Sequence, residues 1–193
     1  MNGYAEIENI LAEQPDSWWE ILLTVLPELG PMADTPQSPY YHAEGDVANH
    51  TRLTVEACPA DCDPDLLWAA LLHDIGKPPT TRVNREKISS RGHERTGAEL
   101  AAELLKRLGM PERRRRRIVW AVRHHTFHLA WQLTCPAQAS KRHKNFVTHK
   151  DFPLLLALLR VDSLASVGHP GKTDAYELYL ELWQDLTGRP EEP

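Results

Sequence analysis

The chain has 193 residues, of which 41% are hydrophobic and 25% are charged, and its mean hydropathy is -0.47. This composition is typical of one folded soluble domain and excludes a disordered or fibrous chain, and no apolar run approaches the roughly 20 residues that a membrane-spanning helix needs. The formal net charge of -5 argues against a protein that coats nucleic acid through bulk charge, so we expect no stable DNA partner.

The N-terminal charges and the numbers of cysteines and histidines indicate the cellular compartment and the residues that are most informative about function. The first eleven residues contain Glu6 and Glu8 and no basic stretch, which argues against a secretory signal. Three cysteines, an odd number, do not make a disulfide framework, so we expect a reducing, cytoplasmic location. Ten histidines are many for this length, and their positions carry most of the functional argument.

The first half of the chain has helical periodicity that stops at proline and glycine. A segment rich in proline, 30–41, separates the first two helices from the next. Between 77 and 91 no helical period is present, and a short hairpin is expected around 83–86. The helices predicted in this half are 4–13, 17–26, 46–57 and 64–75.

The second half is also predicted to be helical, with one polar interruption at 133–150 that we expect to be a loop with a short helix inside. No repeat or linker divides the chain, so the sequence predicts one all-α domain. The helices predicted in this half are 94–108, 111–125, 154–165 (ending before Gly168) and 174–186.

Residues of metal-binding type interrupt three of these helices. His73 and Asp74 end a buried apolar helix, and Asp162 lies inside another. Because an unpaired buried carboxylate is costly, we expect a cation near both aspartates. His50 adds an imidazole from a third helix, and Asp46 precedes it by one turn on the same face. Imidazole combined with carboxylate suits Mn, Fe, Co, Ni or Zn better than calcium.

Each of these residues also has an ordinary structural explanation. A single histidine on a helix is more often a hydrogen-bonded surface or core residue than a ligand. Asp162 alone could pair with Arg160 or with a neighbouring helix. The joint pattern of His50, His73-Asp74 and Asp162 on three separate helices favours the metal site.

This joint pattern resembles the H…HD…D signature of the HD phosphohydrolase superfamily. It is carried by His50-Thr51, by Leu71-Leu-His-Asp-Ile-Gly-Lys-Pro and by Asp162, and the resemblance extends over residues 41–166. Three further motifs are most similar to those of the HD domain of bacterial tRNA nucleotidyltransferases, and they are also similar to those of HD domains found with RNA-repair kinases. These motifs are Tyr41-His-Ala-Glu-Gly-Asp-Val, Arg91-Gly-His-Glu and Val122-Arg-His-His. No nucleotidyltransferase or kinase segment accompanies them in these residues, so we expect a free-standing HD domain.

The resemblance implies a single-domain HD-type helical bundle with its metal site between helices. It divides the chain into an N-terminal helical extension at 1–40, the HD domain at 41–170, and a C-terminal helix and tail at 171–193. The extension is expected either to cap the bundle or to mediate a homodimer.

The resemblance also implies a set of metal ligands. Because some family members bind a second ion through two further histidines, His93 and His125 favour two divalent transition-metal ions bridged by Asp74. His124 and Asp46 are additional candidates, because the two together could bind a third ion. His124 could instead hydrogen-bond to one of the other ligands, or it could be an ordinary surface residue. The six implied ligands are His50, His73, Asp74, His93, His125 and Asp162.

Two cations about 3.5–4 Å apart lower the pKa of a shared water and hold a phosphate oxygen, so the implied enzyme is a metal-dependent phosphohydrolase in which Asp74 is catalytic. Lys77, on the turn after Asp74, is the catalytic candidate for binding a nonbridging phosphate oxygen. Further candidates for the substrate pocket are Arg91, Arg123, His42 and Glu44.

The implied substrate is the phosphate end of a nucleotide or an RNA. Related proteins hydrolyse 2′,3′-cyclic phosphates, 2′-phosphates, nucleoside monophosphates and cyclic nucleotides, and the tRNA-linked resemblance favours the first two. A nucleotide- or RNA-binding module with structural metals is the main alternative, and a diiron oxygenase is a weaker one. The intact set of ligands argues against the binding module.

Two basic clusters are consistent with contacts to nucleic acid. Arginines at 113–117 point all round a helix, which favours a solvated helix face over one phosphate-binding stripe. Basic residues at 141–144, with Phe146 beside them, leave open a site for a single strand or a base.

Overall fold

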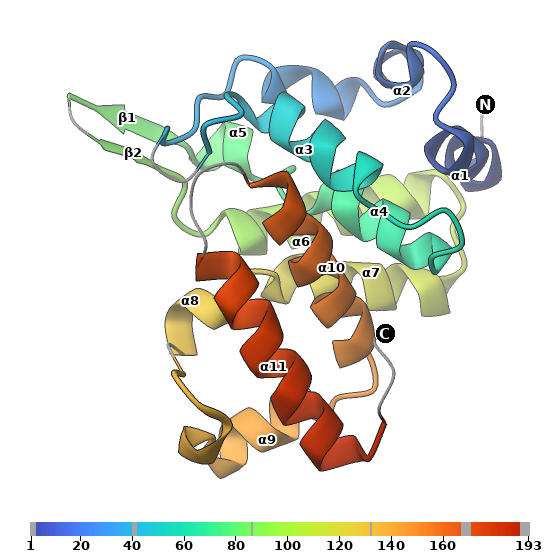
Figure 1. The fold of residues 1–193 in the computed structure, drawn as a ribbon. Coiled ribbons are helices and arrows are strands. Elements are labelled where there is room, and N and C mark those ends of the chain that lie inside the picture. Colours follow the sequence, from blue (N-terminus) through green and yellow to red (C-terminus); the bar gives the residue numbers. More distant parts are fainter. Residues whose placement is uncertain (1–2, 40–41, 86, 132, 167–170, 190–193) are drawn as a thin grey trace.

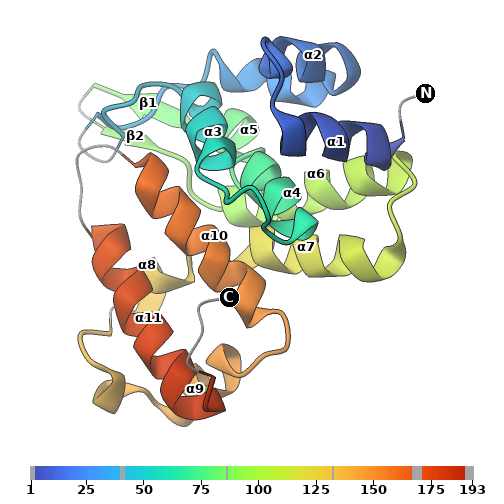
Figure 2. The same cartoon turned by 45° about the vertical axis from the view of Figure 1, so that its right-hand side comes forward.

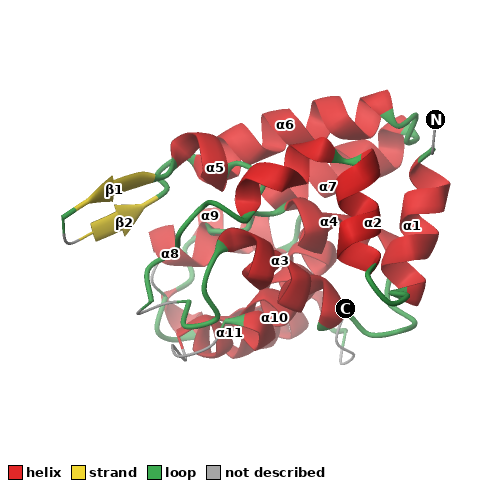
Figure 3. Cartoon of the chain, turned by 90° about the horizontal axis from the view of Figure 1, so that it is seen from above, coloured by secondary structure: helices red, strands yellow, loops and turns green. Residues whose placement is uncertain are grey.

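The computed structural model describes residues 3–39, 42–85, 87–131, 133–166 and 171–189. They form a helical bundle from which one small hairpin projects (Figures 1 and 3), and the all-α prediction is confirmed. None of the described helices is long and apolar enough to span a bilayer.

The α-helices are α1 (Tyr4–Glu13), α2 (Trp18–Val25), α3 (Val47–Glu56), α4 (Pro64–Leu72), α5 (Lys77–Thr80), α6 (His93–Arg107), α7 (Glu112–His124), α8 (Phe127–Trp131), α9 (Lys141–Val147), α10 (Phe152–Ala165) and α11 (Gly171–Thr187). The remaining elements are the 3-10 helices η1 (Pro27–Met32) and η2 (Pro136–Gln138) and the strands β1 (Arg82–Asn84) and β2 (Lys87–Ser89).

The predicted helices agree with the structure to within three residues, and the differences of three residues lie at the start of α11, which begins at Gly171, and at the end of α4. This helix ends at Leu72 instead of residue 75, because the next four residues form a turn that leads into the unpredicted short helix α5. The predicted hairpin is confirmed, with Val83 opposite Ile88. Predicted boundaries at 40, 41, 86, 168 and 170 lie outside the described residues.

α10 lies between two hydrophobic clusters, and in both Figures 1 and 2 it runs beside α11. Leu154, Leu158 and Val161 pack into a cluster with residues of α1–α4, α6 and α7. Leu155 and Leu159 pack into a second cluster with residues of α8, α9 and α11. A helix buried on opposite faces is apolar all round, which explains the nearly unbroken leucine run and leaves the polar Asp162 inside the protein.

The run of arginines at the start of α7 is an ion-paired surface rather than only a solvated one. Arg114 Nε lies 2.6 Å from Asp65 Oδ1, and Arg117 Nη1 lies 2.8 Å from Asp65 Oδ2. Because Asp65 is only 3% exposed in the first turn of α4, its charge needs these guanidinium groups. The prediction of a solvated face was therefore wrong for Arg114 and Arg117, whereas Arg113 and Arg116 are exposed.

Gly76, in the turn after α4, brings that turn into direct backbone contact with α6. A Cβ atom at Gly76 would overlap the carbonyl oxygen of His93 and the amide nitrogen of Gly97. Only glycine permits this approach. The turn that contains Asp74 is therefore held at a set position relative to the first residue of α6, His93.

The close approach of backbone at Gly76 predicts that adding one methyl group there lowers the stability of the fold. Gly76→Ala should lower the free energy of unfolding by about 1–3 kcal/mol, because backbone cannot move aside as a flexible side chain does. Gly30→Ala is the matched control, since a Cβ there meets nothing within 4 Å and Gly30 lies in the 3-10 helix η1. Chemical denaturation of both variants tests this, and equal stability of the two would contradict it.

Candidate metal centre

Asp74 lies between two pairs of imidazole rings. Its Oδ2 atom faces His73 Nε2 at 3.2 Å and His50 Nε2, from α3, at 3.9 Å. Its Oδ1 atom faces His93 Nε2 at 3.4 Å and His125 Nε2 at 3.7 Å. One buried carboxylate thus presents one oxygen to each pair of rings.

Asp162 reaches the same centre from α10. Its Oδ1 atom lies 2.9 Å from His50 Nε2 and 2.6 Å from Lys172 Nζ. Asp162 is 4% exposed and Asp74 is 1% exposed, so both carboxylates are almost fully buried. The structure thereby brings together all six side chains predicted as metal ligands: His50, His73, Asp74, His93, His125 and Asp162.

Backbone carbonyl groups set the orientation of three of the rings. A carbonyl oxygen only accepts hydrogen bonds, so Nδ1 of each ring carries the proton and Nε2, in the neutral ring, presents a lone pair to Asp74. This is the tautomer that metal-binding histidines adopt when a neighbouring oxygen orients them. The three bonds run from His73 Nδ1 to Ala70 O (2.8 Å), from His93 Nδ1 to Ser90 O (2.7 Å) and from His125 Nδ1 to Val122 O (2.7 Å).

The protonation and the hydrogen-bond partners of these rings show whether the centre fits metal ions. His93 Nε2 and His125 Nε2 lie 3.0 Å apart, and burial lowers the pKa of His93 to about 4, so this ring is neutral at pH 7. His73 Nε2 has no hydrogen-bond partner among the described residues, and burial lowers the pKa of His73 as well. Lone pairs that face each other and a carboxylate need positive charge between them. A cation on each side of Asp74 fits that need, and imidazole with carboxylate suits a transition metal.

Two lysines compensate the buried carboxylates. Burial alone would raise the pKa of Asp74, but its interactions with His73 and with the ammonium group of Lys77 hold this pKa well below its ordinary value. Burial would likewise raise the pKa of Asp162, but the charge of Lys172 and the hydrogen bond from His50 hold it well below its ordinary value. Both carboxylates are therefore ionised.

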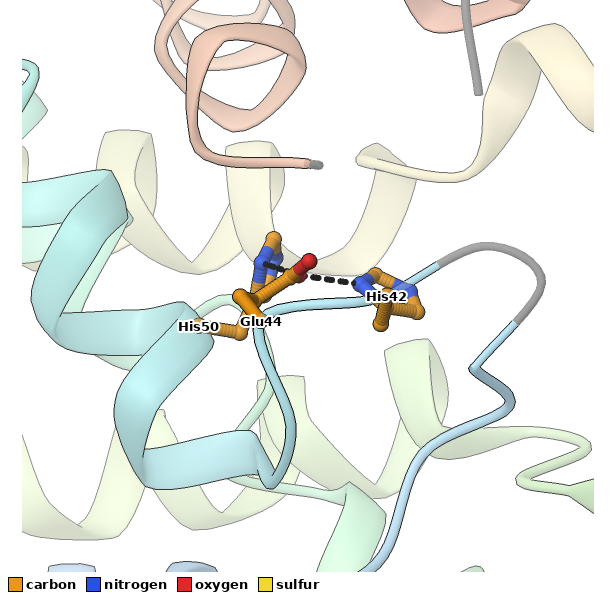
Figure 4. A group of neighbouring side chains, drawn as sticks. All are labelled: His42, Glu44 and His50. Carbon is orange, nitrogen blue, oxygen red and sulfur yellow. Dashed lines mark hydrogen bonds and ion pairs between the residues drawn. The ribbon is translucent and has the colours of Figure 1, made fainter. Parts of the chain in front are cut away.

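Glu44 lies between the rings of His50 and His42 (Figure 4). Its Oε1 atom lies 2.7 Å from His50 Nδ1 and 2.7 Å from His42 Nδ1. Because Glu44 occupies the Nδ1 side of His50, the Nε2 side is left for Asp74 and Asp162. Sequence analysis placed Glu44 only in the substrate pocket and missed its contact with His50.

Two of the additional ligand candidates point elsewhere. Asp46 is the N-cap of α3, where its Oδ1 atom accepts a hydrogen bond from Asn49 N at 2.8 Å. The ring of His124 packs beside Trp120, with centroids 4.8 Å apart. Neighbouring residues on a helix point about 100° apart, so the direction that brings His125 into the centre turns His124 away from it.

A cavity of about 1150 Å³ adjoins the centre, and Lys77 and His42 both line it. Lys77 Nζ lies 2.6 Å from Asp74 Oδ2. The other two predicted substrate contacts, Arg91 and Arg123, are not among its lining residues. Arg123 instead lies 3.8 Å from Glu94 on the surface.

Comparison with known proteins gives a family match and several relatives. Residues 44–160 match the HD domain model. A multifunctional CCA protein of Teredinibacter turnerae is 35% identical over 111 residues, which are 56% of this chain and 26% of that protein. An A-adding tRNA nucleotidyltransferase of Deinococcus radiodurans is 32% identical over 172 residues, 83% of this chain and 37% of that protein. The chain therefore spans about a quarter to two fifths of the length of these relatives.

The two sides of Asp74 predict the metal content of variants. His125→Ala should reduce the bound manganese by about one ion per chain, and Asp74→Asn should reduce it toward zero, because Asp74 is the one carboxylate of the described residues that faces both pairs of rings. Elemental analysis after equilibration with Mn²⁺ and gel filtration measures this. His124→Ala is the neighbouring control and should keep the full content. Full content in His125→Ala would show that the ligand assignment is wrong.

The position of Glu44 predicts a second effect on metal binding. Glu44→Ala should weaken manganese binding about 10–100-fold, because the ring of His50 loses the carboxylate that orients it. Glu56→Ala is the control, because Glu56 is exposed at the end of α3, the helix that contains His50. Isothermal titration calorimetry on both variants checks the prediction, and equal affinities would rule out the orienting role of Glu44.

Proposed function

The chain belongs to the HD domain family, and from this membership and the centre around Asp74 we propose that it is a metal-dependent phosphohydrolase that cleaves a phosphoester of a nucleotide or RNA end. The observation that carries the proposal is the set of buried Nε2 lone pairs on both sides of one ionised carboxylate, beside a cavity. A module that only binds a nucleotide has no chemical need for such a set.

The side chains at the centre divide into two groups of ligands. His50, His73 and Asp162 lie on one side of Asp74, and His93 and His125 lie on the other. Two divalent ions of Mn, Ni, Co, Fe or Zn held there would lower the pKa of water and offset charge on a phosphate. Asp74, between both groups, is the proposed catalytic residue that holds the arrangement together.

Lys77 is the proposed contact to the phosphate. Its ammonium group lies 2.6 Å from Asp74 Oδ2 and 2.5 Å from Gln37 Oε1, and it lines the cavity. A fixed cation at this place offsets the negative charge that builds on the nonbridging oxygens during hydrolysis. Gln37 keeps the ammonium group in position before the substrate arrives.

His42 is a proposed hydrogen-bond acceptor for the substrate. Burial lowers the pKa of His42 to about 4, so the ring is neutral at pH 7. Its Nδ1 atom is bonded to Glu44, which leaves Nε2 of this cavity-lining ring to accept a hydrogen bond from a hydroxyl group. The 2′,3′-cyclic phosphate or 2′-phosphate of a nucleotide or RNA is the favoured substrate. The name of the relative from Deinococcus radiodurans, an A-adding tRNA nucleotidyltransferase, supports a nucleotide or an RNA as the class of substrate.

The direct test is hydrolysis of 2′,3′-cyclic AMP by protein loaded with Mn²⁺ or Ni²⁺. The wild-type protein should form product and Asp74→Asn should form none, with circular dichroism showing equal helix content. Product from Asp74→Asn would overturn the mechanism. No product from the loaded wild-type protein, across cyclic, 2′- and 5′-phosphates, would overturn the proposed function.

The role of Lys77 has its own kinetic signature. Lys77→Met should lower kcat on the order of 10²–10³-fold with a smaller change in KM, because the interaction strengthens in the transition state. Lys87→Met, at an exposed position in β2, is the control and should have wild-type kinetics. A higher KM with unchanged kcat would instead make Lys77 a ground-state binding residue.

A further inference from the structure

The outer half of the cavity is built in part by an element that the family match does not include. α11 begins at Gly171, after the last matched residue at 160, and it forms one wall. α8 and the segment 133–136, which lie within the matched range, line the cavity as well. Because the inner half holds the histidines and aspartates of the centre, the outer half is where the chain's own substrate preference would be set.

One part of this outer wall, formed by α8, the segment 133–136 and α11, is apolar. Leu129 lines the cavity although 63% of its surface is exposed. Leu133, Ala175 and Leu178 line it beside Leu129 and are half-buried. Leucines that stay accessible at a cavity next to polar groups are typical of ligand sites, where an apolar ring covers them.

A buried histidine without a partner lies on the same cavity. His128 is 8% exposed, and within the described part of the chain neither of its ring nitrogens has a hydrogen-bond partner. A buried polar group left unpaired costs about 1–3 kcal/mol. A hydroxyl group of a ligand that enters the cavity would satisfy this ring. His128 is thus a second observation, independent of the leucines, that points to a ligand.

The charges at the outer wall disfavour a long polyanion. Exposed carboxylates of α11 line it, from Asp174, Glu177 and Glu181. Among the described residues, Lys77 and Lys172 are the only lysines or arginines that line the cavity, and each lies 2.6 Å from an aspartate of the centre. The basic residues at 141–144 are not part of the lining. RNA binding depends on cations that neutralise successive phosphates, and this wall offers carboxylates instead.

We propose that the outer wall is a nucleoside subsite, so that the substrate is a single free nucleotide with its phosphate at the centre and its base against Leu129 and Leu178. This inference rests on the proposed function and narrows it, because it excludes the end of an RNA chain as the preferred substrate. His128 bonds a ribose hydroxyl group in this arrangement. The cavity of about 1150 Å³ is large enough, since small-molecule sites occupy roughly 300–1,000 Å³.

Two leucines of nearly equal exposure give a matched test. Leu129 is 63% exposed and lines the cavity, whereas Leu164 is 65% exposed on α10 and does not. Hydrolysis of 2′,3′-cyclic AMP is compared with that of glycerol 1,2-cyclic phosphate, which has the same five-membered ring and no base. In Leu129→Asp the ratio of kcat/KM for the nucleotide to that for the glycerol compound should fall about tenfold or more, because burial of a leucine against the base is lost.

The control Leu164→Asp should keep the wild-type ratio. An unchanged ratio in Leu129→Asp would overturn the subsite while hydrolysis of either compound still supports the proposed function. If the loaded wild-type protein hydrolyses neither compound, the proposed function fails and the subsite fails with it.

A short oligoribonucleotide that ends in a 2′,3′-cyclic phosphate tests the exclusion of RNA. We expect its kcat/KM to be at least about tenfold below that of 2′,3′-cyclic AMP at low salt, where repulsion is strongest. The double variant Glu177→Gln, Glu181→Gln should bring the two values closer together. Equal or faster hydrolysis of the oligonucleotide by the wild-type protein would overturn the inference in favour of an RNA end.

Discussion

The buried charge of Asp74 is the constraint on which the architecture of the centre depends. A carboxylate that is 1% exposed remains ionised only because positive charge surrounds it, here Lys77 and, on both sides, rings that can hold cations. The backbone oxygens behind these rings turn every free lone pair inward. The ligands of the centre are therefore held in fixed orientations by their neighbours, which is the condition for strong and specific metal binding.

The packing of the helices serves this arrangement. α10 is buried on opposite faces, so that Asp162 is placed deep enough to reach His50. The backbone contact at Gly76 sets the distance between the turn with Asp74 and the start of α6 with His93. Since these contacts lie between elements that are distant in sequence, the centre exists only when the whole bundle is folded.

The sequence predicted those parts that local patterns encode. Proline, glycine and apolar periodicity located the helices, and carboxylates inside apolar helices, together with motif resemblance, pointed to Asp74 and Asp162. Contacts that depend on tertiary packing were missed: Lys172 lies ten residues after Asp162 with no spacing to mark it, and neither the orienting contact of Glu44 nor the burial of His128 has a signature in the sequence. The rotational position of α7 determines that His125, and not the adjacent His124, faces the centre, and no pattern in the sequence reveals that position.

The central claim is that Asp74 lies between two bound cations. Anomalous diffraction from crystals of the manganese-loaded protein tests it most directly. The account predicts two peaks, one on each side of the Asp74 carboxylate and roughly 3.5–4 Å apart. A single peak beside His42 and Glu44, or no peak near Asp74, would contradict it.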